Sequence, residues 1–160
     1  MLRSFPTPVV LWVFIAGGCG FWEVKSRTEL PHVTQSSDQL DRQLPIAWTL
    51  FQKRTPQIEL MWMGNAQSEW ELVRHDISGA LLRRVVKINY VFRNANACLW
   101  NDVYLAEEHI ANGHFSGASI RGPVLSSDGT QPIGNPIECG VVERATVGYH
   151  GAASRTAAAH

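Results

Sequence analysis

Residues 68–92 read SEWELVRHDISGALLRRVVKINYVF, and the spacing of apolar residues changes within this stretch. Its first part has apolar residues at intervals of three or four, namely Trp70, Val73, Ile77, Leu81, Val85 and Ile88. This interval places them on one face of an α-helix. Ser68 and Glu71 have the spacing of a capping box, in which two side chains bind backbone amides at the start of a helix. We therefore predict an amphipathic helix from Ser68 to about residue 85.

The last part of the stretch alternates instead. Its apolar residues are separated by single positions, as in Val86, Ile88, Tyr90 and Phe92. This is the period of a β-strand with one buried face, so we expect the helix to give way to a strand.

The segment before residue 68 contains a second alternating pattern. Ile58, Leu60 and Trp62 alternate with other residues between Gln57 and Met63, which predicts a strand with one buried face. Farther upstream, the apolar run 46–51 is short, and its pattern allows either a strand or a turn of helix.

After residue 92, turn residues are followed by another helical pattern. Asn96 can cap a second helix whose apolar stripe contains Leu99, Val103, Ala106 and Ile110. Asn112 and Gly113 would end this helix in a left-handed conformation, and residues 115–121 and 137–147 are expected strands. Together these segments predict an α+β fold, a small single domain with two amphipathic helices packed on a short mixed or antiparallel sheet.

Composition limits the classes of partner. The chain has 160 residues, enough for one domain, and its 45% apolar and 18% charged residues are typical of a globular protein. Basic and acidic residues balance at 14 each, so no electrostatic argument supports a nucleic acid partner.

The N-terminus has the features of an export signal. An apolar run from Val9 to Ile15 follows Arg3, and the small residues 16–18 lead to Cys19. The run is shorter than the about 20 residues that a membrane-spanning helix requires. This stretch resembles a bacterial lipoprotein signal peptide with residues 15–19 as the lipobox, although Ala16 occupies the position where that family prefers Leu.

The resemblance implies that the leader is cleaved before Cys19, which then carries a lipid anchor. Gly20 after the cysteine implies sorting to the outer membrane, with the domain facing the periplasm. The chain would then comprise a signal peptide (1–18), the lipidated cysteine with a polar tether (19–45), the globular α+β domain (46–150) and a disordered tail (151–160). Ordinary cleaved secretion, an uncleaved anchor and a buried strand are the alternative interpretations of the apolar run.

Three cysteines are an odd number for an oxidising compartment. If Cys19 is lipidated, Cys98 and Cys139 remain as a pair, and we predict a disulfide between them. Two independent buried thiols are the alternative.

Several residues have side chains suited to chemistry. Glu107, Glu108, His109 and His114 are metal-ligand types, but His109 and His114 would not share a face of a helix, and we predict no metal site and no cofactor. Cys98 at a helix N-terminus, with His109 or His114 as a base, is the arrangement that a cysteine hydrolase would need.

We therefore predict an envelope lipoprotein with a structural or adaptor role, bound to the membrane through its lipid and to a protein partner, for example in a secretion, conjugation or other envelope assembly. An envelope hydrolase using Cys98 or the His109/His114 region is the first alternative. A lipoprotein that binds glycans or peptidoglycan through exposed tryptophans is the second.

Overall fold

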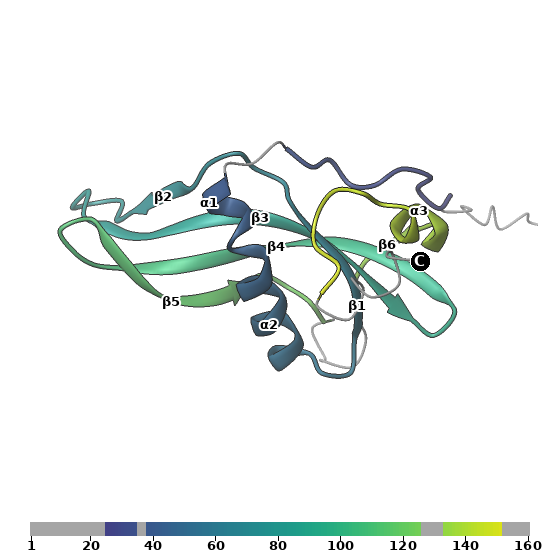
Figure 1. The fold of residues 1–160 in the computed structure, drawn as a ribbon. Helices are drawn as coiled ribbons and strands as arrows, with labels where there is room; N and C mark the ends of the chain where they lie inside the picture. The colour runs from purple at the N-terminus through teal and green to yellow at the C-terminus, as the bar shows by residue number, and fades with distance from the viewer. Residues whose placement is uncertain (1–24, 35–37, 126–132, 152–160) are drawn as a thin grey trace, which may run out of the picture.

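A computed structural model describes residues 25–34, 38–125 and 133–151. Its elements in chain order are α1 (Asp38–Asp41), α2 (Leu44–Arg54), β1 (Glu59–Asn65), β2 (Glu71–Arg74), β3 (Leu81–Asn94), β4 (Ala97–Ala111), β5 (His114–Arg121), β6 (Asn135–Ile137) and α3 (Cys139–Glu143). The strands form one six-stranded antiparallel sheet in the order β1-β3-β4-β5, with β2 also pairing with β3 and β6 with β4 (Figure 1).

The predicted α+β fold with two amphipathic helices packed on a short sheet is wrong, because the described chain is mostly β. Residues 68–85, expected as the first helix, form β2, a turn and the start of β3. The turn spans His75 to Ala80 and includes Gly79 at φ +68°, a left-handed conformation that interrupts a right-handed helix. The apolar residues spaced at three and four between Trp70 and Ile88 therefore do not form one buried face, since Ile77 lies in this turn.

The second expected helix is also a strand. Residues 97–111 form β4, which pairs with β3 over twelve residue pairs, from Arg83 opposite Glu108 to Asn94 opposite Ala97. Asn112 and Gly113, expected to end a helix, connect β4 to β5 with φ values of +50° and +76°. Two successive positive φ values are typical of the tight turns that join antiparallel strands.

The alternating patterns gave correct strands. Val86, Ile88, Tyr90 and Phe92 are completely buried on β3, as predicted. Ile58, Leu60 and Trp62 are also buried, but a bulge at Met61 shifts the register of β1, because Leu60 pairs with Phe92 and Trp62 with Val91. An extra residue reverses the faces of the residues after it. Trp62 consequently packs on the opposite side of the sheet from Leu60.

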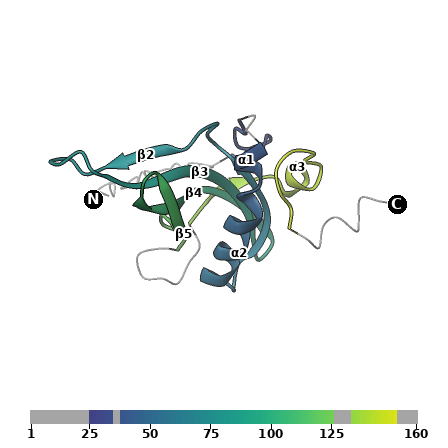
Figure 2. The same ribbon diagram turned by 60° about the vertical axis from the view of Figure 1, so that its left-hand side comes forward.

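The sheet has a core on each side. Figure 2 shows it curving around α2, with α3 on the outside. On the α2 side, the buried cluster includes Phe51, Tyr90, Phe92, Val103 and Leu105. On the α3 side, a smaller cluster contains Trp62, Val91, Cys98, Ile137 and Val142.

Residues 25–34 form an arm along the α3 side of the sheet. Arg27 pairs with Ile137 of β6, because the Arg27 amide donates to the Pro136 carbonyl and the Glu138 amide donates to the Arg27 carbonyl. Asn89 Nδ2 donates to the His32 carbonyl at 2.8 Å. Leu30 and Val33 pack on the smaller cluster. Residues 25–34 and 38–45, assigned from the sequence to the polar tether, therefore contribute to the packing of the domain. The expected signal peptide and Cys19 lie outside the described residues.

Tyr90 provides a test of the core under α2. Burial raises the pKa of the Tyr90 phenol well above its ordinary value, the Asp102 carboxylate acts in the same direction, and the Asn101 side chain and Arg54 oppose them. The unfolded chain loses this proton above about pH 10, whereas the folded chain retains it. The stabilisation from the neutral phenol is therefore present below about pH 10 and is lost as the pH rises further.

We expect Tyr90→Phe to change the free energy of unfolding at pH 7 by less than about 1 kcal/mol, because no hydrogen bond of good geometry to the Tyr90 hydroxyl forms within the described residues. Above pH 10 the variant should lose less stability than the wild type. Urea unfolding at pH 7 and at several values above pH 9.5 measures both, and identical alkaline losses would contradict the prediction.

Candidate functional site

The two cysteines of the expected disulfide are bonded in the structure. Cys98 lies near the start of β4 and Cys139 begins α3, with their Cα atoms 5.3 Å apart. Cys98 is buried, and Met61 packs beside its sulfur at 3.5 Å. The bond fastens α3, and the segment that follows it, to the sheet.

The cysteine–histidine pair considered for a hydrolase is not assembled. Cys98 lies on a strand instead of at a helix N-terminus, and its sulfur is bonded to Cys139. His109 lies toward the other end of β4, about 36 Å farther along the strand at 3.3 Å per residue. His114 begins β5 at that same far end.

The acidic and histidine residues at the far end of β4 have partners of their own. His109 packs its ring edge on Phe115, with centroids 5.5 Å apart, and its Nε2 accepts a hydrogen bond from the Gly113 amide. Glu108 forms salt bridges with Arg83 and Arg121. Within the described ranges, no group of three or more His, Cys, Asp or Glu side chains is arranged to hold a metal ion.

The Arg84 guanidinium stacks on two aromatic rings on the face of the sheet that also carries α2. The Arg84 guanidinium lies 4.4 Å from the Trp70 ring and 4.6 Å from the Phe115 ring, and its Nε donates to Glu107 at 2.7 Å. Each of these contacts stabilises the guanidinium in place. The arrangement joins β3, β4 and β5 to Trp70, the residue before β2, and we interpret it as structural.

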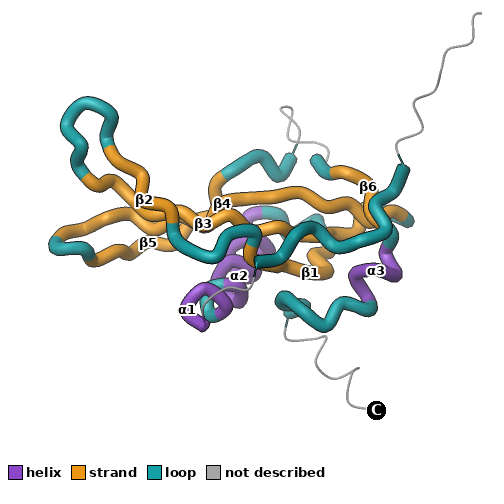
Figure 3. The backbone as a smooth tube through the Cα atoms, turned by 90° about the horizontal axis from the view of Figure 1, so that it is seen from above, coloured by secondary structure: helices purple, strands orange, loops and turns teal. Residues whose placement is uncertain are grey.

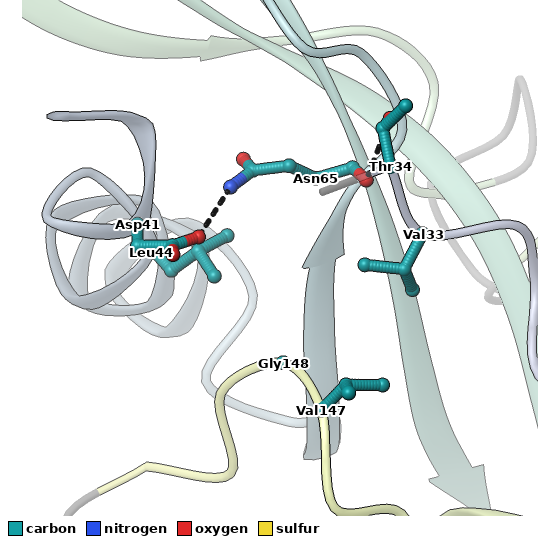
Figure 4. Close-up of a pocket in the computed structure, with 7 residues that line it drawn as sticks. All are labelled: Val33, Thr34, Asp41, Leu44, Asn65, Val147 and Gly148. Carbon is teal, nitrogen blue, oxygen red and sulfur yellow. Dashed lines mark hydrogen bonds between the residues drawn. The ribbon is translucent and has the colours of Figure 1, made fainter. Parts of the chain in front are cut away.

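A pocket of about 430 Å³ lies beside α1 and the end of β1 (Figure 4). Asn65 is central to it, since its Nδ2 donates to Asp41 Oδ1 at 3.2 Å and its carbonyl accepts from the Thr34 amide at 3.1 Å. Val33, Leu44 and Val147 supply apolar walls. These bonds connect the arm, α1 and β1, so the polar groups of the pocket hold the domain together.

Four of the eight exposed large apolar side chains of the described residues lie at one end of the molecule. The β2–β3 and β4–β5 hairpins project from the same end of the sheet, beyond α1 and α2 (Figures 1 and 3). We call this region the hairpin end, and its exposed apolar residues are Leu72, Ile77, Leu82 and Ile110, with exposed fractions of 49%, 93%, 37% and 63%. Exposed apolar residues concentrated in one region are typical of interaction sites.

Ile77 at the hairpin end is held by an ordered turn. His75 Nδ1 accepts hydrogen bonds from the backbone amides of Ile77 and Ser78, each at 3.3 Å. The Gly79 amide donates to the His75 carbonyl at 2.8 Å, and the Arg74 guanidinium donates to the Gly79 carbonyl at 3.1 Å. The turn therefore fixes the backbone that presents Ile77.

Sequence reasoning assigned Ile77 to a buried helical stripe and missed this surface. The signal that could have found it is the run Asp76-Ile77-Ser78-Gly79, in which three of the four residues are common turn formers. A branched apolar residue inside such a run is more consistent with an exposed apex than with a core position.

In comparisons with known proteins, the chain matches no family model, no curated protein and no solved structure. No helix in the described ranges combines the length and apolar character that a membrane span requires.

Proposed function

We propose that this protein is an exported adaptor of the bacterial envelope, anchored in the outer membrane by a lipid on Cys19 and bound to a protein partner through its folded domain. The observation that carries the adaptor role is the hairpin end, where the fold leaves large apolar side chains in solvent. Covering these side chains with a partner lowers the free energy by about 25 cal/mol for each Å² of apolar surface removed from water.

The cysteine arrangement supports the proposed compartment. The bonded pair Cys98 and Cys139 is suited to an oxidising environment such as the periplasm. Cys19 is then the one cysteine left for lipidation, as the resemblance to lipoprotein signal peptides implies.

The four tryptophans that the structure describes favour an adaptor over a glycan-binding protein. Trp48 and Trp62 are buried, and Trp70 and Trp100 are partly buried beneath the guanidinium groups of Arg84 and Arg27. A glycan-binding platform requires an exposed aromatic face, and these four rings are already covered on a face or within the core.

The anchor predicts a specific labelling result. Cells given a fatty-acid analogue should incorporate it into the wild-type protein, and Cys19→Ser should abolish the incorporation because the thioether cannot form. Cys139→Ala is the matched control, since it removes a cysteine outside the signal region and should leave labelling intact. Equal labelling of the wild type and Cys19→Ser would contradict the anchor.

The same wild-type preparation tests the adaptor role separately. Full-length protein extracted from membranes with a mild detergent should elute with a second protein in a complex of constant stoichiometry. Elution as a monomer at every concentration tested would contradict the adaptor role even if the labelling result stands.

A further inference from the structure

The arm, residues 25–34, connects the N-terminal part of the chain to the folded domain. It runs along the sheet from β6 toward α1 (Figure 1, in purple), and within the described chain it belongs to no helix or strand. Half of its side chains are exposed, namely Lys25, Ser26, Thr28, Glu29 and His32. The arm therefore lies on the surface of the domain and contributes only part of its length to packing.

Few bonds hold the arm in place. Within the described residues, four hydrogen bonds of 2.8–3.1 Å join its backbone to the rest of the domain, and they link Arg27 to Pro136 and Glu138, His32 to Asn89, and Thr34 to Asn65. By contrast, β3 and β4 pair over twelve residue pairs. Segments with few hydrogen bonds and little buried apolar surface are the ones that open locally at the lowest free energy. We therefore expect the arm to leave the sheet while the strands stay paired.

The elements around the arm are attached independently of it. Cys139 at the start of α3 is bonded to Cys98 on β4, and β6 pairs with β4 over three residue pairs. After the arm, Leu40 of α1 and Leu44 of α2 are buried in the larger core. Opening of the arm therefore takes Leu30 and Val33 away from the smaller cluster without releasing α3, β6 or α1.

Docking of the arm limits how far the domain can lie from a lipid on Cys19. Cys19 precedes Arg27 by eight residues, which span at most about 28 Å. It precedes Asp38, the first residue of α1, by nineteen residues, which span at most about 66 Å. Release of the arm therefore more than doubles the greatest distance between the lipid and the part of the domain that holds the chain.

We propose that the arm is a detachable segment of the tether, which holds the β6 end near the membrane while docked and extends the reach of the domain when it leaves the sheet. This inference rests on the proposed lipid anchor at Cys19 and describes how that anchor positions the domain. A partner fixed farther from the membrane than the docked arm allows binds only the undocked state. Such a partner shifts the population toward that state, whereas a nearer partner leaves the arm docked.

Hydrogen exchange of the full-length lipidated protein in detergent micelles tests the opening, with mass spectrometry to resolve single amides. Relative to their intrinsic rates, the amides of Arg27, Thr34 and Glu138 should exchange at least about 100-fold faster than the amides that pair β3 with β4. Exchange of the three amides at the β3–β4 rate would overturn the proposal, because the arm would then open only when the whole domain unfolds. Fast exchange at Arg27 with slow exchange at Thr34 would also overturn it, because release would stop short of α1.

A double variant weakens the docked state. Leu30→Ser/Val33→Ser removes the apolar contacts of the arm with the smaller cluster and should speed exchange at Arg27 and Thr34 by about tenfold or more. Thr28→Ser is the matched control, because Thr28 is an exposed residue of the same arm and its replacement should leave exchange unchanged. Unchanged exchange in the double variant would overturn the proposal.

The reach is measured with lipidated protein in phosphatidylethanolamine–phosphatidylglycerol vesicles. A fluorescent amino acid at position 135, an exposed position on β6, transfers energy to an acceptor on the lipid headgroups. The double variant should show lower transfer than the wild type and Thr28→Ser, because its β6 end is no longer held near the bilayer. Equal transfer in the three proteins would overturn the proposed control of reach.

Failure of the tether and failure of the anchor give different results. Slow exchange of the arm amides, combined with fatty-acid labelling that depends on Cys19, would overturn the detachable arm and leave the lipid anchor intact. Labelling that persists in Cys19→Ser would instead remove the anchor, and the control of reach with it, whatever the exchange rates of the arm.

Discussion

Removing both bonded cysteines, as Cys98→Ala/Cys139→Ala, is expected to lower the free energy of unfolding by about 3–4 kcal/mol. The bond closes a loop with a sequence separation of 41, so its loss allows the unfolded chain many more conformations. Urea unfolding followed by tryptophan fluorescence measures the difference, with Trp62 reporting on the cluster that surrounds Cys98.

The reduced wild type is the control for this double variant. Wild-type protein in excess reductant should unfold close to the double variant, because the two share the same unconstrained chain. Agreement between the oxidised wild type and the double variant to within about 1 kcal/mol would contradict the prediction, since it would mean that the cross-link does not restrict the unfolded state.

Gly148→Ala is expected to destabilise the protein by about 3 kcal/mol or more, through two effects at one position. Gly148 has φ +88°, where a β-carbon is strained. An added β-carbon would also lie 2.6 Å from the Met63 carbonyl oxygen and closer still to Trp62 Nε1. The backbone cannot yield there, because Tyr149 exchanges two hydrogen bonds with Met63 and Trp62 Nε1 donates to the Val147 carbonyl.

Gly79→Ala separates the two effects. Gly79 has a similar φ of +68°, but no atom lies within 4 Å of an added β-carbon. This variant should lose only about 1–2 kcal/mol, the cost of the left-handed backbone alone. Urea unfolding of both variants gives the comparison, and equal losses would show that the contact of residue 148 with β1 contributes nothing.

Both large effects act on the same segment. Residues 139–151 begin at the disulfide, pass through α3 and return to the edge of β1, where Tyr149 also packs its ring on Trp48 of α2. The segment therefore links the small cluster on one side of the sheet to the core on the other. Nothing in its local composition predicted this path, and residues 137–147 were expected as a strand.

Local patterns were sufficient for the strands whose two faces differ in polarity. The alternation from Val86 to Phe92 predicted the centre of β3, and these apolar residues are buried as expected. The segment around Leu60 was also predicted as a strand, but the reversal of faces at Met61 was not, because a bulge depends on the partner strand and leaves little trace in local polarity. Neither pattern indicated where the hairpin end would lie.

The helical intervals at 68–85 and 96–110 failed for a different reason. At 96–110, spacings of three and four combine residues from two strand faces, since β4 buries Leu105 on the α2 side and Cys98 on the α3 side. At 68–85, they combine residues of two strands with Ile77 in the turn between them. A strand with both faces buried loses its alternation and cannot be distinguished from a helix by periodicity. Asn96 and Gly113 lie in the turns of the β3–β4 and β4–β5 hairpins, whereas Ser68 lies in the connection between β1 and β2, which do not pair with each other. Pairing between residues far apart in the chain, such as Arg83 with Glu108, decided the conformation, because the backbone hydrogen bonds and the two cores form only when the whole sheet assembles.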